Sequence, residues 1–367
     1  MQNTHKKICI VSICLAKGGA ERSCALLSEM LTAQGHEVHI AILTDDVKFP
    51  YKGTLFNLGK LKKPDEHFGG RFKRLLKLRA YLKKHAFDLV VDHRTKTEYY
   101  RELFYNKVLY KGFKKIYVVH SSNPDLYLTR RPNEFAKVYN KNAATVGVSK
   151  YISETILPSF GITNATTIHN AFDPDWKEIE TVLPEGLTPG NYILSYGRID
   201  EPVKDITFLL NSYTASNLWK EGVQLVILGD GEDKKALQQF AKTLPSGSQI
   251  VFLPAQSPFH ILANAQFVTL TSKFEGFPMV LVESLSLGIP AVSLDIVSGP
   301  SEIIKHEQNG LLIAKRNVSL FAKGMQRMSL DGVLRDKCKQ NAKASVAQFS
   351  TDEIAKQWNQ LVYNELR

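Results

Sequence analysis

Short apolar runs alternate with amphipathic segments along the first half of the chain. The run KICIVSIC (residues 7–14) predicts a buried strand, and AERSCALLSEMLTAQG (20–35) spaces its apolar residues along one face of a helix that ends at Gly35. HEVHIAIL then alternates as a strand. We predict four further strands in this half, at FDLVVDH, KKIYVVHSS, AATVGVS and NATTIHNAF.

The second half repeats this alternation, with strands predicted at NYILSYGRID, VQLVILGDGE, SQIVFLP, QFVTLTSKFEG, PAVSLD and GLLIA. Two such halves predict an α/β fold of two doubly wound, Rossmann-like domains. We place an N-terminal domain at residues 1–175 and a C-terminal domain at residues 176–349. Residues 350–367 form an amphipathic helix that is expected to pack back on the N-terminal domain.

The first residues admit a second interpretation, as a secretory signal, because Lys6 and Lys7 precede a short apolar stretch. The small-x-small cleavage pattern is missing around Ala16, and the domain pattern needs this segment as its first strand, so we favour the strand. No run approaches the about 20 apolar residues that span a bilayer. Four cysteines without a CxxC pair suit a reducing cytosol and argue against a structural metal site.

Positive charge is concentrated in one half of the chain. Residues 1–175 carry 28 Lys and Arg against 16 Asp and Glu, whereas residues 176–367 carry 19 against 20. A net charge confined to one domain suggests an anionic partner on that side.

Two carboxylates interrupt a mostly apolar stretch, TSKFEGFPMVLVESLSLGIPAVSLD (271–295). Glu275 follows a strand in the turn, Pro278 suits the first position of a helix, and Glu283 lies little more than one turn into that helix. The free N–H groups at such a helix start can seat a phosphate, and a carboxylate one turn later can bind a ribose. For either glutamate alone, an exposed residue without a function would be the simpler explanation.

A cationic pair at another strand end changes that balance. In YGRIDEPVKD, Arg198 and Lys204 stand six residues apart in a turn that could wrap a diphosphate. Each alone could equally belong to an ordinary surface loop. Together with the two glutamates, they predict a site for a nucleotide diphosphate.

The order of these motifs resembles that of retaining glycosyltransferases of family four (glycosyl transferases group 1), which have the GT-B fold. The resemblance therefore implies that the two Rossmann-like domains face a central cleft. The resemblance rests on Gly-Arg, the Lys six residues after the Arg, GDGE, the two glutamates eight residues apart, SGPSEII and NGLL. It runs over most of the chain and is densest from Asn191 to Ile313. It implies an enzyme that transfers a sugar from a nucleotide-sugar, with UDP favoured over GDP, in the synthesis of a bacterial envelope glycan.

The resemblance also implies roles for individual residues. Arg198 and Lys204 would hold the donor diphosphate and neutralise the leaving group, and Glu283 would bind the ribose. Glu275 would contact the sugar with the backbone of Gly276 and Phe277. After Pro278, Met279 and Val280 would give amides to the β-phosphate, and the loop that begins at Leu253 and Pro254 would lie against the base. At Pro254 and Ala255 this loop departs from the family pattern, which often has a glycine there.

Two further sites are predicted in the N-terminal half. Gly18 and Gly19 follow the first strand and let a donor approach the backbone closely, although they do not form a GxGxxG dinucleotide motif. His120 closes the strand IYVVH. A lone histidine there is more often structural, but the resemblance places it beside the transferred sugar as a catalytic residue, with Glu275, Arg198 and Lys204.

The segment RFKRLLKLRAYLKKH (71–85) predicts a basic amphipathic helix, with Phe72, Leu75, Leu76 and Leu82 along its apolar side. Such a pattern is often only a solvated helix face. Because the half is so basic, we favour docking of Arg71, Lys73, Arg74 and Lys77 to an anionic membrane or glycolipid acceptor. The expected location is therefore cytoplasmic and peripheral, on the inner face of the cell membrane.

The predicted reaction is metal-independent and needs no cofactor, because no Asp-x-Asp motif stands where a metal-dependent transferase would need one. The partners are a nucleotide-sugar donor and a glycan or lipid-linked glycan acceptor. A GT-B epimerase of sugar nucleotides is the alternative, since it would use the same Arg and Glu residues without an acceptor surface. A nucleic-acid-binding protein would explain the basic half and the aromatic segment 96–115, but it would leave the four site residues without a role, so we expect no nucleic-acid partner. We interpret residues 96–115 as a helix.

Overall fold

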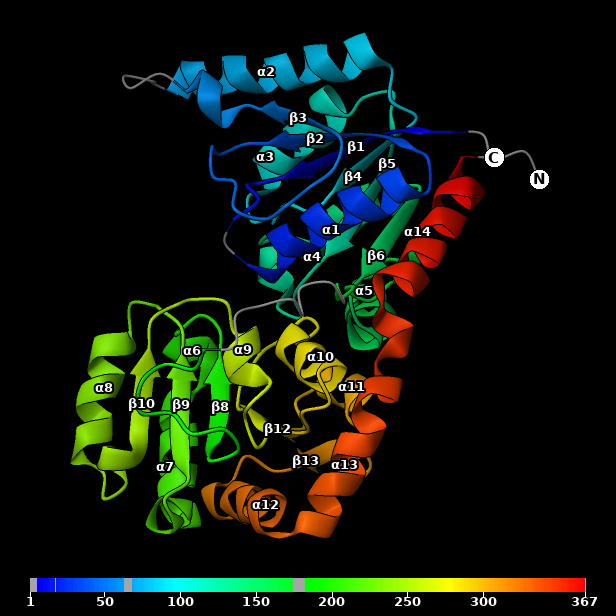
Figure 1. Ribbon diagram of the computed structural model, residues 1–367. Coiled ribbons are helices and arrows are strands. Elements are labelled where there is room, and N and C mark those ends of the chain that lie inside the picture. Colours follow the sequence, from blue (N-terminus) through cyan, green and yellow to red (C-terminus); the bar gives the residue numbers. More distant parts are fainter. Residues whose placement is uncertain (1–4, 17, 63–67, 174–181, 367) are drawn as a thin grey trace. The chain divides into compact units, whose positions relative to one another are not determined.

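The structure is a computed structural model that describes residues 5–16, 18–62, 68–173 and 182–366. The chain divides into two compact units, one of Met1–Ala171 with Thr351–Arg367 and one of Phe172–Ser350 (Figure 1). The predicted boundary at residue 175 lies outside the described residues.

The first unit is built around a seven-stranded sheet in the order β3-β2-β1-β4-β5-β6-β7, in which every pairing is parallel. Its strands are β1 (Lys7–Ser12), β2 (Glu37–Ile42), β3 (Thr54–Asn57), β4 (Leu89–Asp92), β5 (Lys114–Val119), β6 (Ala144–Gly147) and β7 (Ala165–Thr167). Its helices are α1 (Gly19–Ala33), α2 (Phe68–His85), α3 (Tyr99–Phe104), α4 (Pro132–Tyr139), α5 (Leu157–Ser159) and α14 (Thr351–Glu365).

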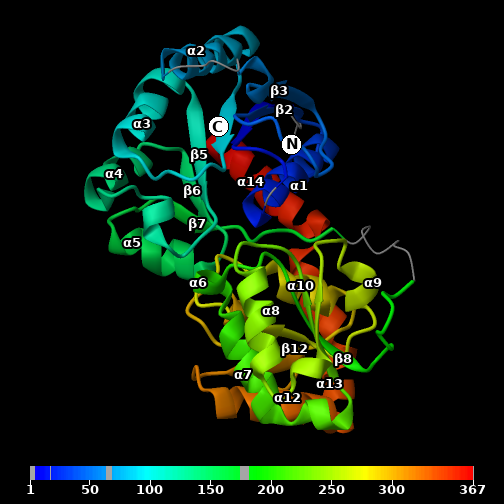
Figure 2. The same ribbon diagram turned by 90° about the vertical axis from the view of Figure 1, so that its left-hand side faces the viewer.

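Helices cover both faces of this sheet. Figure 2 shows α3, α4 and α5 on one side of β5 and β6, and α14 on the other with α1. The last helix is tied to the unit by a hydrogen bond between His36 and Asn359 (2.9 Å) and by Lys114 Nζ, which donates to the carbonyl of Glu365 (2.6 Å). Because β1 is central and buried from Ile8 onward, its uninterrupted apolar run is that of a strand covered on both faces. The interpretation as a strand is confirmed.

The second unit has a six-stranded parallel sheet in the order β10-β9-β8-β11-β12-β13. The strands are β8 (Tyr192–Tyr196), β9 (Gln224–Leu228), β10 (Ile250–Leu253), β11 (Val268–Leu270), β12 (Ala291–Leu294) and β13 (Gly310–Ile313). The helices are α6 (Glu201–Lys204), α7 (Ile206–Ser216), α8 (Lys234–Thr243), α9 (Phe259–Leu262), α10 (Met279–Ser286), α11 (Pro300–Ile303), α12 (Val318–Leu330) and α13 (Gly332–Ser345).

Successive residues of these strands feed two separate cores. Ile193 packs in a cluster with residues of α7 and α12, whereas its neighbours Tyr192 and Leu194 pack in another with residues of α9. This alternation follows from the pleat of a strand, which sends successive side chains to opposite faces. The α/β class and the two doubly wound sheets are thereby confirmed.

Three details of the prediction were wrong. The strand β3 was not predicted, because its four residues TLFN give too short a pattern. The helix predicted over residues 96–115 is limited to α3 and a π-helical turn, Tyr105–Leu109, and Lys114 and Lys115 belong to β5. On α2, Phe72 and Leu76 were predicted to lie on the apolar side with Leu82, but both are exposed; Leu82 is buried as predicted, together with Leu78.

Candidate active site

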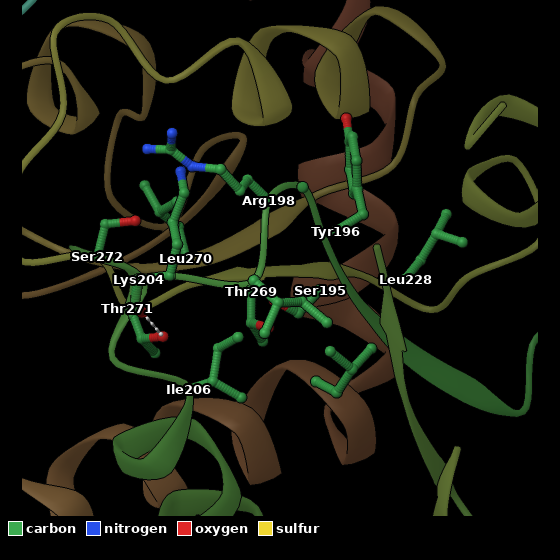
Figure 3. Close-up of a pocket in the computed structure, with 13 residues that line it drawn as sticks. Ser195, Tyr196, Arg198, Lys204, Ile206, Leu228, Thr269, Leu270, Thr271 and Ser272 are labelled. Atoms are coloured by element: carbon green, nitrogen blue, oxygen red, sulfur yellow. Dashed lines mark hydrogen bonds between the residues drawn. The ribbon is translucent and has the colours of Figure 1, made fainter. Parts of the chain in front are cut away.

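The predicted cationic pair lies at the point where the strand order of the second sheet reverses. Strands β8 and β11 are neighbours, but the chain proceeds from β8 to one side and from β11 to the other. Ligands of doubly wound sheets bind beyond the strand ends at such a switch point. Arg198 follows β8, Lys204 ends α6, and both line a small pocket there (Figure 3). The pocket holds only about 20 Å³, so a diphosphate would have to bind at its mouth rather than inside it.

Lys204 and Glu275 form an ion pair in the structure. Lys204 Nζ lies 2.6 Å from Glu275 Oε1, and the hydroxyl of Ser272 donates to the same oxygen at 2.7 Å. Arg198, by contrast, is 69% exposed and reaches Asp200 at 3.0 Å. The structure therefore brings Arg198, Lys204 and Glu275 to one end of the sheet, with the arginine accessible to an anion.

The glycines of the GDGE motif shape the turn that carries Arg198. A Cβ at Gly229 would collide with the carbonyl oxygen of Gly197, and one at Gly231 with that of Ile199. The backbone N–H of Ile199 donates to the carbonyl of Asp230 at 2.9 Å. These glycines are thus required for the close approach of two backbone segments.

Arg316 supports the same site and was not predicted from the sequence. Its guanidinium donates to Asp205 Oδ2 (2.5 Å) and to the carbonyl oxygens of Thr271 (2.9 Å) and Ser272 (2.6 Å). It therefore joins the end of the turn that bears Lys204 to the turn that bears Glu275.

The turn before α10 is held by the SGPSE segment. The hydroxyl of Ser298 donates to the carbonyl of Gly276 at 2.8 Å, and a Cβ at Gly299 would collide with the ring of Pro278. Phe277 is buried, with its ring edge-on to Phe349. Pro278 occupies the N-cap, one position before the predicted one, so that α10 begins at Met279 with Val280 next. Pro278 itself provides no side-chain capping hydrogen bond.

Glu283 is buried, with only 3% of its surface exposed. Its Oε2 accepts a hydrogen bond from the hydroxyl of Tyr196 at 2.7 Å. Tyr196 ends β8, so it carries a second unpredicted link between the switch-point strand and α10. Glu275 and Glu283 therefore have different partners, one a lysine and the other a tyrosine.

The loop predicted to lie against the base is fixed by Lys234. Its Nζ donates to the carbonyl oxygens of Gly229 (2.8 Å) and Leu253 (3.0 Å) and pairs with Asp230 (2.7 Å). Asp230 in turn accepts from the backbone N–H of Ala255 at 2.9 Å. The exposed Pro254 stands between these anchored residues.

The three site residues predicted in the N-terminal half lie in the first unit. Gly18 is the extended N-cap of α1, and Gly19 is its first residue, where an added Cβ would meet nothing within 4 Å. His120 follows β5, and its Nε2 lies 3.0 Å from Nδ1 of the buried His93. Burial, and then the neighbouring His93, hold the pKa of His120 well below its usual range. Burial likewise lowers the pKa of His93 to about 3, so both rings are neutral and form one donor–acceptor pair.

Two families match the chain, one on each half. The family described as Glycosyl transferases group 1 matches residues 184–345, and Glycosyltransferase Family 4 matches residues 17–176. The chain belongs to these glycosyltransferases. All of the donor residues predicted in the second unit lie inside the first match, and Gly18, Gly19 and His120 lie inside the second.

Relatives of this glycosyltransferase include enzymes named for a diphospho-undecaprenol-linked acceptor and for lipopolysaccharide. It is 27% identical, over 96% of its length and 98% of the other protein, to N-acetylgalactosamine-N,N'-diacetylbacillosaminyl-diphospho-undecaprenol 4-alpha-N-acetylgalactosaminyltransferase of Campylobacter jejuni. It is 35% identical, over 42% of its length and 44% of the other, to the lipopolysaccharide 1,6-galactosyltransferase of Escherichia coli. The structure of HepE of Anabaena with UDP and glucose superposes with a TM-score of 0.78, at 18% identity, over 98% of this chain and 100% of the other. The GT-B fold and the resemblance read from the sequence are confirmed.

The cations of the basic helix α2 differ in exposure. Lys73 and Lys77 are exposed, whereas Arg74 is half-buried and donates to the carbonyl of Leu58 at 3.3 Å. The side chain of Arg71 lies outside the described residues. Phe72, with 45% of its surface exposed, and Leu76, with 39%, are exposed on the same helix as Lys73 and Lys77.

Neither a metal cluster nor a membrane-spanning helix occurs in the described ranges. No three His, Cys, Asp or Glu residues among them gather closely enough to hold a metal ion. None of the described helices is both long and apolar enough to cross a bilayer.

Proposed function

We propose that this glycosyltransferase moves a sugar from a UDP-sugar to a hydroxyl of a glycan or lipid-linked glycan of the bacterial envelope. The observation that carries the proposal is the group of Arg198, Lys204 and Glu275 at the switch point of the second sheet. The choice of UDP is supported by HepE, whose structure contains UDP and glucose. The choice of acceptor is supported by the names of the two relatives, one acting on a diphospho-undecaprenol glycan and one on lipopolysaccharide.

In this proposal the donor lies across the ends of β8 and β11. Arg198 and Lys204 bind the diphosphate, together with the backbone N–H groups of Met279 and Val280 at the start of α10. Glu283, oriented by Tyr196, accepts hydrogen bonds from the ribose. The anchored loop at Leu253 and Pro254 lies against the base, and Gly18 and Gly19 bind the donor from the first unit.

Charge that develops on the departing diphosphate is the main barrier to sugar transfer, and preorganised cations lower it. Glu275 holds Lys204 in place before the donor binds. When the donor binds, the ammonium group of Lys204 also contacts the phosphate, or leaves Glu275 for it. Glu275 then accepts a hydrogen bond from a hydroxyl of the sugar, which also contacts the backbone of Gly276 and Phe277. The neutral His120 can donate or accept a hydrogen bond at the transferred sugar. We propose that the reaction retains the anomeric configuration and proceeds without a metal or cofactor.

The proposed acceptor and membrane surface belongs to the first unit. Phe72 and Leu76 expose apolar surface beside Lys73 and Lys77, a combination that suits the interface of an anionic membrane. We therefore propose peripheral binding to the inner face of the cell membrane, with Arg71, Lys73, Arg74 and Lys77 on the membrane or acceptor side.

Vesicle sedimentation tests this surface. Each lysine near anionic lipid contributes about 1 kcal/mol, so Lys73→Gln/Lys77→Gln is expected to weaken binding to phosphatidylglycerol vesicles by about 30-fold. Lys323→Gln/Lys339→Gln, at two exposed lysines of the second unit, is the matched control and should change nothing. Equal binding by both variants would rule out the α2 surface.

The transfer itself is tested by incubating the enzyme with a panel of UDP-sugars and lipid-linked glycan acceptors. We expect release of UDP that depends on the acceptor, and NMR of the product should show the anomeric configuration of the donor sugar. An inverted product would contradict retention. A conversion of the UDP-sugar into its epimer without transfer would contradict the proposed function.

A further inference from the structure

A larger cavity, of about 790 Å³, lies within the first unit at the switch point of its own sheet. Strands β1 and β4 are neighbours there, and the chain continues from β1 to β2 on one side and from β4 to β5 on the other. This is the position where doubly wound sheets bind ligands. The charged lining among the described residues consists of Asp45, Lys62, Arg74, Arg94 and Arg101.

Arg94 is the innermost of these cations and is buried. Its Nη2 pairs with Asp92 (2.7 Å) and Glu102 (3.0 Å), and its guanidinium lies 3.5 Å from the ring centroid of Tyr105. Its Nε has no hydrogen-bond partner within the described part of the chain. A buried donor left unpaired costs about 1–3 kcal/mol, and a ligand in the cavity that this residue lines could supply the missing acceptor.

Burial alone would lower the pKa of Arg94, but Asp92 and Glu102 raise it well above its usual value. The guanidinium therefore stays charged in its buried position. The structure thus keeps a fixed cation at the inner end of the cavity.

The other cations approach from separate elements. Arg101, on α3, donates to Glu102 Oε1 (2.9 Å) and to the hydroxyl of Thr97 (3.1 Å). Arg74, on α2, donates to the carbonyl of Leu58, and the exposed Lys62 stands after β3. A ligand in the cavity would thus be surrounded by donors from several directions, as an oxyanion requires.

Positive charge exceeds negative charge around this cavity. Asp45 is the one carboxylate among the described lining residues, and its Oδ1 already accepts from Asn57 at 2.7 Å. Asp92 and Glu102 offset two of the cations from behind, but the buried Lys96 adds another, 3.6 Å from Asp92. An anion in the cavity would balance this excess of positive charge.

We propose that this cavity binds a phosphate-bearing part of the acceptor, at a distance from the hydroxyl that is glycosylated. This proposal rests on the proposed function, because it takes the ligand to be the acceptor of the transferase. A guanidinium group can donate two parallel hydrogen bonds to two oxygens of one phosphate. A cavity of this volume also accommodates one or two sugar rings. The enzyme would thereby select acceptors by their phosphate as well as by their terminal sugar.

The test measures binding of simple phosphates to the full chain by calorimetry. All titrations use Arg198→Ala/Lys204→Ala as the background, so that phosphate binding at the donor site is removed and failure of the donor proposal does not affect the result. The probes are inorganic pyrophosphate, glucose 1-phosphate, glucose and glucuronate. Into this background we introduce Lys62→Gln/Arg74→Gln, which removes cations at the cavity without disturbing the buried pair of Arg94.

Arg79→Gln is the matched control. Arg79 lies on the same helix as Arg74 and donates to a carbonyl oxygen in the same way, that of Leu109 at 3.1 Å, but it does not line the cavity. Circular dichroism melting verifies that each variant remains folded.

We expect both phosphates to bind at millimolar concentrations or below. Lys62→Gln/Arg74→Gln should weaken them by at least tenfold, and Arg79→Gln should leave them unchanged. A further titration with geranyl diphosphate identifies the source of the phosphate. Tighter binding of geranyl diphosphate than of glucose 1-phosphate indicates a lipid diphosphate, and the reverse order indicates a phosphorylated sugar. The proposal is overturned if no phosphate binds, if glucuronate binds as tightly as glucose 1-phosphate, or if Arg79→Gln weakens binding as much as the cavity variant does.

Discussion

The ion pair between Lys204 and Glu275 leads to the most detailed prediction. Lys204 Nζ lies 2.6 Å from Glu275 Oε1. If the same nitrogen contacts a donor phosphate at about 3 Å, the carboxylate and the phosphate lie about 6 Å apart with the lysine between them. Lys204 then has two tasks, since it binds the phosphate and also screens it from Glu275.

The two tasks have different magnitudes. A hydrogen bond to a charged group is worth about 2 kcal/mol. Two unit charges about 6 Å apart interact by about 3 kcal/mol at an effective dielectric constant of about 20. Lys204→Met should therefore weaken UDP binding by three to four orders of magnitude, or about 5 kcal/mol. Glu275→Gln, which removes the repulsion, should leave UDP affinity unchanged or higher while sugar transfer is lost.

The double variant separates these terms. Lys204→Met/Glu275→Gln should bind UDP about 100-fold more tightly than Lys204→Met, because the repulsive carboxylate has gone. Calorimetry of the four proteins with UDP measures this coupling. Lys273→Met is the control, because Lys273 lies in the same turn as Glu275 but is exposed and lies 3.8 Å from Asp205. If the double variant binds UDP no better than Lys204→Met, the screening argument is refuted.

Three further predictions concern the residues that support the sites. Tyr196→Phe removes the hydroxyl that donates to the buried Glu283, and is expected to lower the free energy of unfolding of the second unit by about 1–3 kcal/mol in urea titrations. Gly231→Ala should lower both the melting temperature and UDP affinity, because its Cβ would displace Ile199 and the turn of Arg198, whereas Gly19→Ala should not change the melting temperature. Because the pKa of His93 is about 3 when folded, the unfolded chain takes up the proton first as the pH falls below about 6.5, and stability is lost from there down to about pH 3. His93 alone should cost the first unit about 2 kcal/mol between pH 6.5 and pH 5, and urea titrations of His93→Asn should show a smaller pH dependence by that amount.

The sequence was sufficient for the elements on which the donor residues stand. Buried parallel strands produce uninterrupted apolar runs, and polar residues that follow such runs lie at one edge of the sheet. For this reason Arg198, Lys204 and Glu275 could be placed together from their positions alone. The order of the strands, which makes β8 and β11 neighbours, depends on pairings between distant segments and became visible only in the structure.

The supporting residues could not be found in this way. Arg316 is 111 residues from Asp205, and Tyr196 is 87 residues from Glu283, so no local pattern connects them. The helix α2 shows a different limit. The sequence pattern grouped Phe72 and Leu76 with Leu82 on one apolar side, but Leu82 is buried with Leu78 whereas Phe72 and Leu76 are exposed. Because all four residues are apolar, the pattern alone could not decide which of them face the core.

The central claim is that the second unit binds the diphosphate of a UDP-sugar through Arg198 and Lys204. Calorimetric titration of UDP and GDP into the wild-type protein and into Arg198→Ala/Lys204→Ala tests it most directly. We expect micromolar binding of UDP, weaker binding of GDP, and loss of UDP binding in the variant. Absence of binding to either nucleotide, or unchanged UDP affinity in the variant, would contradict the account.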